Sequence, residues 1–201
     1  MQRFAAGSGS LNRSHGKSAC MHVVINADDF GMSTSINEAV VELYSRGSIS
    51  SATLLVDRPG SGAAAAMALA AGMPVGLHFN LTIESLCHGR RDFERRYFSG
   101  RLSMAAVEQE LRRQLSALRA LGLAPSHVDS HQHVHRWPRL FRAVAGVAAD
   151  AGLPVRLVAE WPVRVRGARL TRVDGLHFLQ RRVGRWLAAR NRRTAVRMGV
   201  R

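Results

Sequence analysis

The sequence predicts a single α/β domain built around a parallel sheet, and three observations lead to this fold class. The chain has 201 residues, 46% of them apolar, which suits one well-buried domain and is short for two. Short apolar runs alternate with segments of helical periodicity, an order typical of strands and covering helices in a parallel sheet. Polar side chains follow several of the apolar runs, at the strand ends where such sheets bind ligands.

The first strand is expected at residues 22–26, a short apolar run that leads into a polar turn at residues 27–31. A helix should follow, because Ser35 and Glu38 form a capping-box pattern ahead of apolar residues spaced for one helical face. Gly47 should end this helix.

The same alternation of strand-like and helix-like periods predicts the elements in the middle of the chain. Residues 49–56 and 74–79 are expected to be the second and third strands, with an alanine-rich helix over 63–71 between them. Residues 84–100 have no clear period and many charges, so we expect a loop or lid there. A strongly amphipathic helix is predicted over residues 102–121.

The last third repeats the alternation. A fourth strand should begin at residues 127–129 and be followed by a helix over 141–151. A fifth strand is expected at 155–158, and residues 170–193 should be mostly helical. The whole chain from residue 21 to residue 201 is expected to form one domain.

The N-terminal residues 1–20 are polar and rich in glycine and serine, so we expect a disordered leader, with Met21 as a more natural start. They lack the apolar core of a secretory signal, and the chain has no apolar run of about 18 residues that could span a membrane. Cys20 and Cys87 form no disulfide framework, which fits a reducing compartment. A cytoplasmic protein is therefore predicted.

The formal net charge of +15 is concentrated near the C-terminus. Residues 156–201 contain 13 arginines and only two acidic residues. An arginine-rich helix can bind phosphates, but few aromatic residues interrupt this one, so nucleic-acid binding is not expected. A solvated helix face explains the charge equally well.

Four metal-capable side chains occupy every second position of residues 129–135: Asp129, His131, His133 and His135. In an extended chain these side chains would converge on one face. Imidazoles packed this closely are typical ligands of zinc and other divalent ions. Because a solvated histidine-rich loop would look the same, the stretch needs partners elsewhere in the chain.

The ends of the other predicted strands supply such partners. Asp28 and Asp29 follow the first strand, and His78 ends the third. One carboxylate could hold a metal while its neighbour acts as general base, although the pair could also be a turn or helix cap. His78 alone could be a hydrogen-bonded core histidine. Together, oxygen and nitrogen ligands without thiolate suit Zn, Mn, Co or Mg, and Cys87 is not expected among them.

Three motifs, at residues 26–31, 76–82 and 127–135, resemble those of the YdjC-like family in order and spacing. This is a group of metal-dependent carbohydrate deacetylases that includes chitooligosaccharide deacetylases and proteins associated with hopanoid biosynthesis. The resemblance runs from about residue 21 to about residue 160. It implies a TIM-barrel-like (β/α) fold and hydrolysis of an N-acetyl group from an amino sugar, such as a chitooligosaccharide or a hopanoid-linked sugar.

The resemblance also implies roles for individual residues. Asp29, His78 and His131 would hold the divalent metal, Mg or Zn, and Asp28 would be the general base. His133 or His135 would donate a proton to the leaving amine, and the choice between them stays open. Two further roles complete the predicted site: Asp129 would orient an imidazole, and Asn80 would contact the substrate.

Members of the family are usually longer, with further strands and a late histidine-containing segment. We therefore expect a barrel that is incomplete at its C-terminal end, whose exposed edge would favour association into a homo-oligomer. Two alternative functions stay open. The first is a metal-dependent phosphoester hydrolase, which would need basic residues near the metal, and only the 90–96 loop offers them. The second is an inactive shortened homologue whose basic tail binds nucleic acid or an acidic partner.

Overall fold

The computed structural model describes residues 23–158 and 174–200, so the predicted leader at residues 1–20 lies outside it. Four strands form one sheet in the order β1-β2-β3-β4, and all neighbouring pairs are parallel. The parallel α/β fold class is therefore confirmed. The strands are β1 Asn26–Phe30, β2 Ser51–Leu54, β3 Val75–Phe79 and β4 Val128–Ser130.

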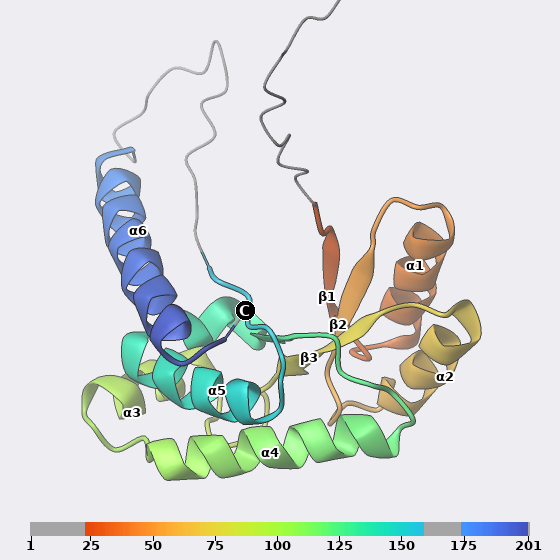
Figure 1. The fold of residues 1–201 in the computed structure, drawn as a ribbon, viewed down its shortest axis with the longest axis horizontal. Coiled ribbons are helices and arrows are strands. Elements are labelled where there is room, and N and C mark those ends of the chain that lie inside the picture. Colours follow the sequence, from red (N-terminus) through yellow and green to blue (C-terminus); the bar gives the residue numbers. More distant parts are fainter. Residues whose placement is uncertain (1–22, 159–173, 201) are drawn as a thin grey trace, which may run out of the picture.

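Helices alternate with the strands along the chain, and they pack in two groups, α1 with α2 and α4 with α5 and α6 (Figure 1). Helix α1 packs beside α2, α4 beside α5, and α5 beside α6. No helix in the described ranges is long and apolar enough to cross a membrane. The helices are α1 Thr34–Ser45, α2 Ser61–Ala71, α3 Arg90–Phe98, α4 Met104–Ala120, α5 Pro138–Asp150 and α6 Asp174–Arg197, with a 3-10 helix η1 at His131–Arg136.

The two faces of the sheet differ in chemistry because strand side chains alternate. Leu54, Leu77 and Val128 point to one face and belong to the fully buried apolar core. The opposite face carries polar residues that are also buried, including Thr53 and His78. The sheet register places such residues on neighbouring strands beside one another. A buried polar face is stable only when its groups bond to each other, so these residues should form a hydrogen-bonded network.

The first strand lies further along the chain than predicted, at residues 26–30 instead of 22–26. Residues 23–25 form no strand, and all three of their apolar side chains are exposed. The reason is the register, since Asn26 pairs with Ser51, the first residue of β2. Strand pairing therefore starts at Asn26, and Asp28 and Asp29 lie within the strand instead of after it.

Two helix predictions also need correction. The N-cap of α1 is Ser33 instead of Ser35, because the Ser33 hydroxyl accepts the bond from the Ile36 amide at 3.4 Å. The segment expected to be a loop contains helix α3, which buries Phe93 and Tyr97. Their spacing of four residues puts both on one helical face, a signal that the many charges concealed.

The predicted fifth strand is reduced to a single bridge between Val155 and Val128, and residues 156–158 have no regular structure. Helix α6 is described from Asp174, so the predicted start at residue 170 lies outside the described residues. The four parallel strands agree with a barrel, but closure of the barrel and its completeness stay predictions.

Candidate metal centre

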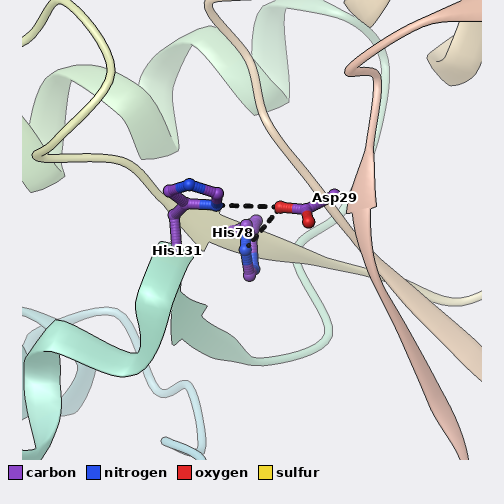
Figure 2. A group of neighbouring side chains, drawn as sticks. All are labelled: Asp29, His78 and His131. Atoms are coloured by element: carbon purple, nitrogen blue, oxygen red, sulfur yellow. Dashed lines mark hydrogen bonds and ion pairs between the residues drawn. The ribbon is translucent and has the colours of Figure 1, made fainter. Parts of the chain in front are cut away.

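Asp29, His78 and His131 come together from β1, β3 and the start of η1, and the Asp29 carboxylate points at both imidazoles (Figure 2). Asp29 Oδ1 lies 3.1 Å from His78 Nε2 and 2.9 Å from His131 Nδ1. One ligand atom from each residue lies within 4.8 Å of those of the others. This mixed oxygen and nitrogen set fits a divalent ion with open positions for water.

A bulge in β1 lets two consecutive carboxylates reach this site. The register with β2 shifts between Ala27 and Phe30, and Asp29 has a left-handed backbone with φ of 61°. In a regular strand neighbouring side chains point to opposite faces. Because the bulge re-aims Asp29, it meets the histidines while Asp28 stays on the polar face.

Asp129 fixes the orientation of His78. His78 Nδ1 lies 2.6 Å from Asp129 Oδ1, and donation from Nδ1 leaves Nε2 directed towards Asp29. Thr53 donates a second bond to Asp129, at 3.2 Å. Burial disfavours protonation of His78, but the hydrogen bonds and charges of Asp129 and Asp29 together outweigh it and raise its pKa to about 9. Asp129 thus orients an imidazole, as a buried carboxylate beside a metal ligand commonly does.

The imidazoles also act on Asp29. Hydrogen bonds from His131 and then His78 hold the pKa of its carboxyl well below the usual range. Asp29 is therefore an anion at neutral pH, the state that a carboxylate ligand needs.

The histidine-rich stretch is not extended, so its four side chains do not converge on one face as predicted. After Ser130 the chain turns into η1, where Gln132 and His133 have left-handed backbones with φ of 56° and 53°. His131 consequently meets Asp29, whereas Asp129 lies beneath His78 and His135 is fully buried. Alternation fails because it assumes an extended chain through residue 135, whereas the strand β4 ends at Ser130.

His135 has no free ring nitrogen. Nε2 donates to the backbone carbonyl of Arg156 at 2.8 Å, and Nδ1 lies 2.5 Å from the Ser130 hydroxyl. Burial lowers the pKa of His135 to about 4, so the ring is neutral. His133 differs, because it is only partly buried and its Nδ1 has no hydrogen-bond partner among the described residues. The ring nitrogens of His135 are therefore both used within the protein, whereas the unpartnered Nδ1 of His133 is itself buried.

Asn80 is fully buried, and its side chain is used entirely within the protein. Its amide group donates to Asp57 and to the Ile83 carbonyl, while its oxygen accepts from the amides of Thr82 and Ile83. These bonds hold the loop after β3, and the substrate contact of Asn80 stays a prediction. Buried polar groups bonded in this way stabilise a fold without meeting a ligand.

Arg156 is a site residue that the sequence analysis missed. Its Nη1 donates to both oxygens of Asp28, at 3.0 and 3.1 Å, and to Asp129 at 3.3 Å. It was counted among the arginines of the basic C-terminal region, although it lies within the predicted fifth strand at residues 155–158. The strand-end rule did not select it, because it is the second residue of that strand.

Fold and site together define a class: a parallel α/β protein with a group of side chains that could hold a metal ion at the functional edge of its sheet. Comparison with known proteins gives the family. The family model described as "YdjC-like protein" matches residues 22–200. The chain belongs to the YdjC-like family.

Several relatives carry the name deacetylase. A chitooligosaccharide deacetylase of Serratia marcescens is 40% identical over 151 residues, covering 69% of this chain and 60% of the relative. A carbohydrate deacetylase of Geobacillus stearothermophilus is 37% identical, covering 76% of this chain and 64% of the relative. A human carbohydrate deacetylase is 33% identical, with coverages of 84% and 53%. The chain thus spans less than two thirds of the length of these relatives.

A solved structure supports the fold alone. It is a protein of Enterococcus faecalis V583 whose proposed role is cellobiose-phosphate cleavage, and it aligns with a TM-score of 0.59 at 21% identity. The alignment covers 81% of this chain and 64% of that protein.

Proposed function

We propose that this protein is a metal-dependent hydrolase that removes the acetyl group from an N-acetylated amino sugar. The observation that carries the proposal is the meeting of Asp29, His78 and His131 at one point. Relatives named chitooligosaccharide and carbohydrate deacetylase support the substrate class. Chitooligosaccharides are therefore the first substrates to test, and the hopanoid-linked sugar is the second. The cytoplasmic location and homo-oligomeric state stay predictions.

Asp29, His78 and His131 would hold the ion, with Mg or Zn as the candidates. When bound, such an ion polarises the amide carbonyl and makes water a stronger acid. Asp129 keeps His78 turned towards the ion by holding its Nδ1 hydrogen. The left-handed backbone of Asp29 also positions a proposed ligand, because it aims the carboxylate between the two imidazoles.

Asp28 is the proposed general base, which accepts a proton from the attacking water. Arg156 holds the Asp28 carboxylate in place through both oxygens. His135 in turn holds Arg156 through its backbone carbonyl. His133 is the proposed donor of a proton to the leaving amine, because its side chain is partly exposed, whereas His135 is buried and both of its ring nitrogens are bonded within the protein.

Acetate release from N-acetylglucosamine and its short oligomers, with and without added Mg²⁺ or Zn²⁺, tests the proposal. Asp29→Ala and His131→Ala should lose both bound metal and activity, whereas Asp28→Asn should keep the metal and lose activity. The exposed His88 provides a matched control, and His88→Ala should change neither. Metal content unchanged by Asp29→Ala and His131→Ala would show that the site is misplaced.

A phosphoester hydrolase is the second candidate, because Arg156 supplies the cation near the metal centre that this chemistry requires. The contacts of Arg156 with Asp28 and Asp129 argue against it, since this guanidinium is already neutralised. Release of nitrophenol from p-nitrophenyl phosphate without acetate release from the sugars would establish this alternative.

A further inference from the structure

A basic groove lies between α5 and α6, outside the metal centre. It encloses about 580 Å³, a volume within the usual range for small-molecule sites. Neither of the two α helices carries any residue of the proposed catalytic machinery. Five arginines line the groove together with Trp186: Arg139 and Arg142 from α5, and Arg190, Arg193 and Arg197 from α6. We call these residues the arginine groove.

The way α6 docks explains why its arginines face α5. Leu187, Asn191 and Ala195 recur every four residues and are buried, so they form the packed stripe of the helix. Asn191 fixes the contact by donating to the Arg136 carbonyl at 2.8 Å. The groove arginines of α6 border this stripe and line the space beside it.

No carboxylate lines the arginine groove. Elsewhere the described arginines commonly have acidic partners, such as Arg112 with Asp150 at 2.6 Å and Arg113 with Glu110 at 2.7 Å. The groove contains nothing comparable. Arg139 and Arg190 lie only over the rings of Tyr97 and Trp186. Arg142, Arg193 and Arg197 take part in no salt bridge with described residues, and all five arginines are exposed.

Like charges that face each other across a groove repel, and this repulsion lowers the stability of the packed helices. A protein that bound nothing there would gain from an acidic residue on α5 or α6. An anion in the groove would remove the repulsion and would accept hydrogen bonds from several guanidinium groups. Arginine suits phosphate groups especially, because its planar donors match two phosphate oxygens at once.

We propose that the arginine groove binds a small compound with at least two phosphate groups, such as a diphosphate ester. Five cations exceed what a single phosphate neutralises. The limited volume favours a small molecule over a polymer. Trp186 is 58% exposed and offers an apolar surface to the rest of the ligand, and Thr194 adds a hydroxyl donor. This binding function goes beyond the proposed deacetylation and uses none of its residues.

Isothermal titration with inorganic pyrophosphate and inorganic phosphate, at constant ionic strength, tests the proposal. The wild-type protein should bind pyrophosphate at least about tenfold more tightly than phosphate. Arg142→Gln and Arg193→Gln should each weaken pyrophosphate binding about tenfold, the effect expected from losing a charged hydrogen-bonding partner. The control is Arg101→Gln, which removes an exposed arginine outside the groove and should leave binding unchanged.

A second control separates this groove from the metal centre, since pyrophosphate also binds metal ions. Asp29→Ala should lose metal and deacetylation but keep its affinity for pyrophosphate. Loss of pyrophosphate binding in that variant would overturn the groove proposal, as would equal weakening by Arg101→Gln and Arg193→Gln. Tight binding of a single-stranded oligonucleotide that pyrophosphate cannot displace would also overturn it, in favour of a polymeric partner. Circular dichroism should show that every variant is folded.

Discussion

Protonation of His135 should destabilise the folded protein in mild acid, because the structure holds this imidazole neutral. The side chain is completely buried, and its two ring nitrogens bond to Ser130 and to the Arg156 carbonyl. Protonating Nδ1 would place a positive charge in a site without solvent. Burial accordingly lowers the pKa of His135 to about 4, from an ordinary value of 6.5.

The sign and size of the effect follow from proton binding. Between pH 6.5 and 4 the unfolded chain binds a proton at His135 and the folded protein does not, so the free energy of unfolding falls as the pH falls. The difference between the two pKa values corresponds to about 3 kcal/mol over this window. The contribution is fully present above pH 6.5 and is lost by about pH 4.

Urea denaturation from pH 4 to pH 8 measures this dependence, with His135→Gln as the variant and the exposed His88→Gln as the control. The variant should be less stable than wild type at pH 7, but the gap should shrink by about 3 kcal/mol towards pH 4. Other titrating groups are common to both proteins and largely cancel in the difference. A gap that stays constant with pH, or the same narrowing in His88→Gln, would refute the reasoning.

Three further predictions concern the metal centre and its surroundings. The raised pKa of His78, about 9, means that a bound ion must displace a proton, so metal affinity measured by titration should increase from pH 6.5 towards pH 9. A flat profile would mean that His78 is not a ligand. Arg156→Gln should lower kcat by about tenfold or more while metal content stays unchanged, because Asp28 loses its support. Arg156→Lys should restore part of kcat if charge matters, and none if only the paired geometry matters. Asn80→Ala should lower the free energy of unfolding by about 2 kcal/mol, because the Asp57 carboxylate and the Thr82 amide would lose their hydrogen-bond partner. A raised KM with unchanged stability would instead support substrate contact.

The fold was predictable wherever a segment's own pattern decides its structure. Helix α4 was identified because Val107, Leu111 and Leu115 share one helical face. The strand β3 was identified from a short apolar run between turn residues. The first strand was misplaced because Val23, Val24 and Ile25 look like a buried strand, whereas the paired register with β2 begins only at Asn26. Pairing register is a property of two segments, and a pattern within one segment does not contain it.

Some residues of the candidate site were likewise predictable from the sequence, and others were not. The rule that ligands gather at the carboxyl ends of parallel strands placed Asp29, His78 and His131 among a wider set of candidates, and the family resemblance then singled them out as the residues that would hold the metal. Arg156 was missed because its contact with Asp28 joins residues 128 positions apart. The role of His135 was also hidden, since left-handed residues turn the chain away from the extended form that the alternation assumed.

Backbone strain marks the same site independently of its side chains. Four non-glycine residues in the described part of the chain have a positive φ, and three of them, Asp29, Gln132 and His133, border the metal centre. Each such conformation costs on the order of 1 kcal/mol, and it persists only when surrounding contacts enforce it. Here Asp29 in the bulge contacts His78 and His131, and the Ser130 hydroxyl accepts a bond from the His135 amide across the turn into η1. The two strained segments are therefore held by bonds of the site itself, and these bonds bring Asp29 and His131 together.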